Sequence, residues 1–87
     1  MKQFTYTIKD ELGIHARPAG LLAKLAKGYG EKTVITVTQD GNTVKASQLM
    51  KLMGMGIKQG NEVVVAAEGP AEDEAITAVQ KFFEENL

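Results

Sequence analysis

The chain has 87 residues, of which 44% are hydrophobic and 24% charged, a balance typical of one small globular domain. Cysteine is absent and His15 is the only histidine, which excludes disulfides, thiol catalysis, zinc fingers and any metal site built from several histidines. The net charge of −1 argues against a dedicated nucleic-acid binder, and no apolar run approaches the roughly 20 residues of a membrane span. We therefore expect one cytoplasmic domain over residues 1–87, with no signal peptide, no membrane insertion and no metal.

Charge is distributed unevenly along the chain. Residues 1–60 carry nine basic and four acidic side chains, whereas residues 61–87 carry one basic and seven acidic ones. A basic body with an acidic end indicates an acidic partner, or an anionic group handled within the first two-thirds of the chain.

The first two elements differ in their hydrophobic period. Alternating apolar and threonine residues over 4–8 predict a half-buried strand. Apolar residues then recur at helical spacing and predict a helix over 16–27. Pro18 falls in the first turn of this helix, where a missing N–H costs nothing, and Gly28 is expected to be its C-cap.

The middle of the chain predicts a hairpin followed by a short helix. The β-branched run 33–38 predicts a second strand, and Asp40-Gly41 is a strong signal for a tight turn into a third strand over 43–45. Ser47 stands where an N-cap is expected, before a short helix over 49–53 that glycines end.

The last third predicts one more strand and one more helix. Residues 62–67 form the strand, and the helix begins near Pro70 with acidic residues 72–74 at its positive end. The apolar stripe expected to face the core comprises Ala75, Ile76, Val79, Phe82 and Phe83. The order β-α-β-β-α-β-α predicts an α+β, two-layer open-faced sandwich, a four-stranded antiparallel sheet with three helices on one face.

Residues 13–19 (GIHARPA) are the candidate site. The pattern places His15 at or just before the start of a helix, so the free N–H groups of Ala16 and Arg17 point at anything attached to the imidazole. The positive end of the helix keeps the ring neutral and nucleophilic, Arg17 reaches an anion held there, and Gly13 lets the backbone turn sharply. A lone histidine at a helix start is more often a cap or a surface residue. Its combination with glycine, arginine and proline indicates a phosphoryl acceptor.

This motif resembles the active-site motif of HPr, the histidine-containing phosphocarrier family of the bacterial phosphoenolpyruvate-dependent sugar phosphotransferase system. The resemblance extends over the whole chain, through its length, the element order, the hairpin 41–44, the short helix ending at 54–57 and residues 67–69. It implies that His15 takes a phosphoryl group from enzyme I on Nδ1 and passes it to IIA domains of sugar transporters, with Arg17 assisting. It also implies a carrier that uses no cofactor and is not an enzyme in its own right.

The sequence departs from the HPr pattern at one regulatory position. Many Gram-positive members carry a serine at the start of the short helix that a dedicated kinase phosphorylates. Counted back from Gly56, that position is Gln48 in this chain, and Ser47 lies one residue earlier. Ser47 is therefore either a displaced regulatory site or, more plainly, a helix cap.

A partner-binding face follows from helical geometry. Arg17, Leu21 and Lys24 share one stripe of the first long helix, opposite its core face. The short helix is too small to bury all of its apolar residues, so we assign Leu52 to the core and the others to an adaptable patch, although methionines also fill core gaps. The expected partner-binding residues are Gly20, Leu21, Lys24, Lys27, Leu49, Met50, Lys51 and Met53.

Two other functions compete with a monomeric phosphocarrier. One is an HPr-like regulatory module that binds other proteins without carrying phosphate, or a paralogue from a nitrogen-related or accessory branch. The other is a small nucleic-acid domain, which the charge and the lack of paired aromatic residues on a strand disfavour.

Overall fold

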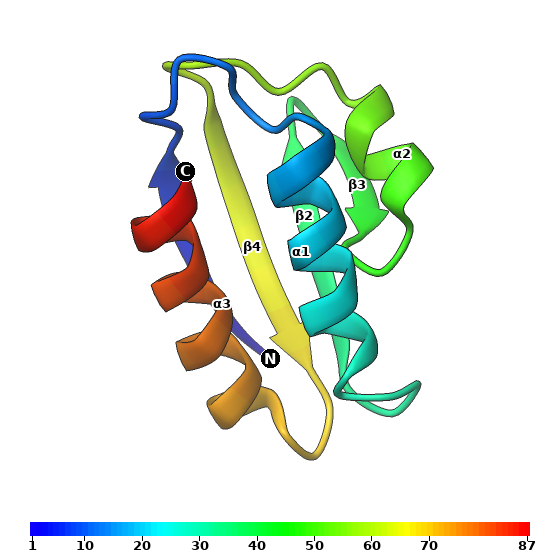
Figure 1. Ribbon diagram of the computed structural model, residues 1–87. Helices are drawn as coiled ribbons and strands as arrows, with labels where there is room; N and C mark the ends of the chain where they lie inside the picture. Colours follow the sequence, from blue (N-terminus) through cyan, green and yellow to red (C-terminus); the bar gives the residue numbers. More distant parts are fainter.

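Strands and helices follow one another in the predicted order in the computed structural model, which describes residues 1–87. The strands are β1 (Lys2–Thr7), β2 (Val34–Gln39), β3 (Asn42–Lys45) and β4 (Glu62–Glu68). The helices are α1 (Ala16–Lys27), α2 (Leu49–Gly54) and α3 (Glu72–Asn86). All strand pairs are antiparallel in the order β1-β4-β2-β3, and the three helices cover one face of the sheet (Figure 1). The predicted open-faced sandwich is confirmed.

The sheet has one apolar face because its residues alternate in register. Val65 in β4 pairs with Phe4 on one side and with Val37 on the other, so three apolar side chains point toward the helices. The next pair along, Thr38 with Val64, faces away and is only half-buried. The helices cover only the apolar face of the sheet, and the second face has no covering layer.

The helices bury the apolar stripes that the sequence predicts. In α1 the buried side chains are Pro18, Ala19, Leu22, Ala23 and Ala26. In α3 the stripe is narrower than predicted, because Ile76 and Phe82 are only half-buried at its edges. The ring of Phe83 packs edge-on against Phe4 and Tyr6, with centroid separations of 5.8 and 5.5 Å. These aromatic contacts hold α3 against β1, while α1 lies between α3 and α2 (Figure 1).

The two turns that the sequence singles out behave differently. Asp40 and Gly41 both have positive φ, 50° and 82°, which is the type I′ geometry predicted for the hairpin. Gly28 is the C-cap of α1, but its φ of −63° is right-handed and the chain reverses only at Gly30, where φ is 75°. The reversal is delayed because Tyr29 and Gly30 donate to carbonyls three residues back and so tighten the last turn.

Several predicted boundaries are wrong by one or two residues. Gln48, not Ser47, is the N-cap of α2, because a hydrogen bond from its N–H to the Lys45 carbonyl (3.0 Å) turns the chain directly after β3. The strand β1 ends at Thr7, although Ile8 stays buried beside the sheet. Finally, α3 begins two residues after Pro70, and the predicted acidic residues occupy its first turn.

Candidate functional site

A tight contact between two loops positions the start of α1. Gly13 has a φ of 65°, and a Cβ placed on it would lie 2.2 Å from the carbonyl oxygen of Ile57. The next residue, Ile14, donates its N–H to the same carbonyl at 3.1 Å and buries its side chain. Only glycine tolerates both this backbone angle and this close approach. The contact between the two loops therefore fixes the position of residue 15.

His15 is the N-cap of α1. Its backbone is extended (φ −111°, ψ −175°) and its carbonyl accepts the N–H of Ala19 at 2.9 Å, the first hydrogen bond of the helix. The imidazole makes no capping hydrogen bond and is half-buried, so its nitrogens remain free to react. The N–H groups of Ala16 and Arg17 have no acceptor within the protein, and Pro18 has no N–H.

The electrostatics of this helix start favour an anion. The first turn of α1 contains no acidic residue, so nothing on the helix opposes the positive end of its dipole. The side chain of Arg17 is exposed beside His15 and carries a planar group that binds phosphate oxygens in pairs. Two free amides, a helix terminus and a guanidinium therefore surround the imidazole with donors for an anionic group.

A shallow depression of 260 Å³ brings the histidine together with residues from the opposite end of the chain. It is lined by Asp10, His15, Arg17, Pro18, Leu21, Glu85 and Asn86. The end of α3 reaches this place because the Leu87 carbonyl accepts the N–H groups of Lys9 and Asp10, at 2.6 and 2.8 Å. The carboxylates of Asp10 and Glu85 therefore oppose part of the positive charge around the site.

Sequence reasoning missed several residues around the histidine. Glu85 and Asn86 lie some seventy positions from His15 along the chain, and no local pattern connects them to it. Leu12, three residues before the histidine along the chain, is not among the residues that line the depression, and 71% of its surface is exposed.

The α1 part of the expected partner-binding face is exposed. Leu21 has 45% of its surface accessible, Lys24 and Lys27 are exposed, and Gly20 is half-buried beside them. This stripe runs from Arg17 along the helix on the side that faces away from the sheet.

The α2 part of this face differs from the expectation at one residue. Met50 is 81% exposed, Met53 is 41% exposed and Lys51 is exposed, whereas Leu52 is fully buried as predicted. Leu49 is half-buried and packs against the core. Because α1 and α2 are in contact, these two exposed sets of residues lie on neighbouring helices (Figure 1).

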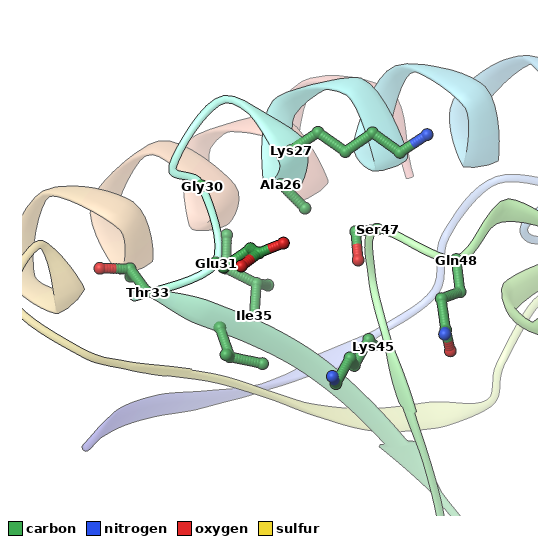
Figure 2. Close-up of a pocket in the computed structure, with 10 residues that line it drawn as sticks. Ala26, Lys27, Gly30, Glu31, Thr33, Ile35, Lys45, Ser47 and Gln48 are labelled. Carbon is green, nitrogen blue, oxygen red and sulfur yellow. The ribbon is translucent and has the colours of Figure 1, made fainter.

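Ser47 lies away from the histidine. Its hydroxyl faces a separate cavity near the end of α1, which shares no lining residue with the depression around His15 (Figure 2). The side chain is half-buried.

The fold and the site together define a class of protein, a small α+β phosphocarrier with a histidine at a helix start. A sequence model described as the phosphorylation site of the PTS HPr component matches residues 2–85. The chain belongs to the HPr family, and it is a phosphocarrier of the phosphotransferase system and not an enzyme acting on a substrate of its own.

Individual relatives agree with this membership. The phosphocarrier protein HPr of Mycoplasma genitalium is 35% identical over 86 residues, which cover 99% of this chain and 97% of that protein. The HPr of Mycoplasma capricolum is 36% identical over 81 residues, covering 93% and 89%. The crystal structure of an HPr from Thermoanaerobacter tengcongensis superimposes with a TM-score of 0.90 at 40% identity, covering 98% of this chain and 93% of that one.

The structure has neither a membrane-spanning helix nor a cluster of metal ligands. None of its helices has the length and the apolar character needed to cross a lipid bilayer. No three histidine or acidic side chains gather closely enough to hold a metal ion.

Proposed function

We propose that His15 carries the phosphoryl group, which it accepts on Nδ1 from enzyme I and passes to IIA domains of sugar transporters. The observation that carries this proposal is the imidazole at the N-cap of α1, free of hydrogen bonds and next to two amides without acceptors. A cytoplasmic relay follows from this pairing of partners.

The transfer step uses the geometry of the helix start. The lone pair of the unprotonated ring nitrogen attacks phosphorus, the N–P bond forms, and the bond between phosphorus and its donor breaks with its electron pair returning to the donor. The N–H groups of Ala16 and Arg17, with the guanidinium of Arg17, stabilise the negative oxygens as they pass through the transition state. Transfer to the acceptor is the reverse of this step, and the reactive N–P bond makes the onward transfer favourable.

The surface around the site suits docking onto proteins with an acidic patch. Lys24, Lys27 and Lys51 are exposed basic residues on the two helices that also carry the exposed apolar side chains of Leu21 and Met50. Flexible methionine side chains adapt to more than one partner, which a relay between two different proteins requires. Basic residues around an apolar centre also speed the encounter with an acidic surface.

The test is incubation with phosphoenolpyruvate and enzyme I, followed by intact-mass measurement. We expect the mass of one phosphoryl group to be added to the wild-type chain and to be absent from His15→Ala. Because His15 is half-buried and makes no side-chain hydrogen bond, this variant is expected to keep its fold, which circular dichroism checks. A chain that gains no mass, or a His15→Ala variant that gains it, would instead favour the HPr-like regulatory module.

A further inference from the structure

A cavity of 470 Å³ lies at the end of α1 that is far from His15. Its walls come from the last turn of α1 and the loop after it, from the start of β2, and from the segment that joins β3 to α2 (Figure 2). Its size falls within the ~300–1,000 Å³ of typical small-molecule sites. Lys27 is the one lining residue that also belongs to the expected partner-binding face.

Three charged side chains that form no salt bridge line the cavity. Lys27 and Lys45 line it, as does Glu31, whose carboxylate points into the opening in Figure 2. None of the three takes part in either of the two salt bridges of the structure, which join the Met1 amine to Glu72 and Lys2 to Asp73. With two positive groups and one negative group, the cavity favours an anion over a cation.

Uncharged polar groups complete the lining. The hydroxyl of Ser47 is directed toward the cavity and is absent from the local hydrogen bonds, which join Gln48 N–H to the Lys45 carbonyl and Ala46 N–H to the Ile35 carbonyl. Gln48 adds an amide that both donates and accepts. The buried side chain of Ile35 provides an apolar floor.

We propose that this cavity binds a small phosphate monoester that also carries hydroxyl groups, such as a sugar phosphate. Lys45 and the Ser47 hydroxyl donate to the phosphate, and Lys27, whose side chain runs along α1 in Figure 2, adds positive charge at the rim. Glu31 and the Gln48 amide accept hydrogen bonds from the hydroxyl groups. A bare phosphate ion meets the repulsion of Glu31 and leaves those acceptors unused, so it is expected to bind less well.

The test is a titration of the ¹⁵N-labelled chain with glucose 6-phosphate, followed by ¹H–¹⁵N correlation spectra at constant ionic strength. We expect saturable shifts centred on the amides of residues 30–31 and 47–48, with inorganic phosphate and glucose each binding about tenfold more weakly, the loss expected for one strong hydrogen bond. The titration involves neither enzyme I nor phosphoryl transfer, so its failure leaves the proposed function untouched.

Two variants of matched charge identify the site. Lys45→Gln removes one cavity charge and is expected to weaken glucose 6-phosphate binding by about tenfold or more. Lys81→Gln removes the same charge from the exposed side of α3 and is expected to leave binding unchanged. The proposal is overturned if no saturable shift occurs, if the shifts centre on residues 15–17, or if both variants bind alike. The dispersion of each spectrum shows whether the variant has folded.

Discussion

The substitution Gly13→Ala tests how the loop contact positions His15. An alanine at this position would keep a φ of 65° and place its methyl group 2.2 Å from the Ile57 carbonyl oxygen and 2.7 Å from the Lys58 Cα. Both neighbours are backbone atoms, so neither moves without displacing the segment between α2 and β4. Displacing that segment would also strain the hydrogen bond from the Ile14 N–H to the Ile57 carbonyl.

The magnitude has two parts. A left-handed backbone costs a non-glycine residue about 1–2 kcal/mol. Forcing a methyl group into a closed contact costs about 1–3 kcal/mol more. Gly30→Ala separates the two parts, because Gly30 has a φ of 75° but nothing within 4 Å of its Cβ position. We therefore expect the free energy of unfolding to fall by about 1–2 kcal/mol for Gly30→Ala and by about 2–5 kcal/mol for Gly13→Ala.

Urea and thermal unfolding of the two variants and the wild type measure this difference. Each kcal/mol lowers the melting temperature of a domain of this size by about 4–8 °C, so Gly13→Ala is expected to melt at least about 4 °C below Gly30→Ala. Phosphoryl transfer is expected to be slowed in Gly13→Ala and retained in Gly30→Ala. Equal stability of the two variants would refute the steric argument.

Three further predictions concern transfer, docking and pH. Arg17→Ala is expected to slow transfer about 10- to 100-fold, the loss of one charge-assisted hydrogen bond, with an unchanged melting temperature because the side chain is exposed; a large loss of stability would contradict this. Met50→Glu is expected to slow phosphoryl transfer from enzyme I because it weakens docking. Gln80→Glu places the same charge on the exposed side of α3 and is expected to leave the transfer rate unchanged. Similar transfer rates for the two variants would show that Met50 is not part of the docking face. The Glu72 carboxylate accepts hydrogen bonds from the N-terminal ammonium of Met1 (2.9 Å) and from the Gly69 N–H, which hold the pKa of Glu72 below its ordinary 4.5. This pairing therefore stabilises the fold above about pH 4.5 and is lost as the pH falls through the lowered pKa. Glu72→Gln is therefore expected to lose less of its melting temperature than the wild type between about pH 6 and about pH 3, and equal losses would show that the pairing does not stabilise the fold.

Local features were predictable where short-range physics decides them. The bounds of α1 follow from a helical repeat of small and apolar residues, and the hairpin follows from Asp40-Gly41, whose backbone angles suit only a primed turn. The position of His15 at a helix start also follows from local sequence, because Pro18 is tolerated only in the first turn.

Contacts between distant segments had no such signal. Asp10 and Glu85 share the depression with His15 only because the end of α3 docks onto the loop after β1. The half-burial of Leu49 likewise depends on how α2 rests on the core, which a helical pattern of six residues does not specify.

The sequence by itself therefore determined the elements, the fold class and the histidine at the head of α1, since hydrogen bonds and hydrophobic period act over a few residues. Only the tertiary structure decided which charges surround that histidine, why residue 13 must be glycine, and where a cavity opens beside Ser47. Each of these depends on packing between segments that are far apart along the chain, and packing is set by the whole fold.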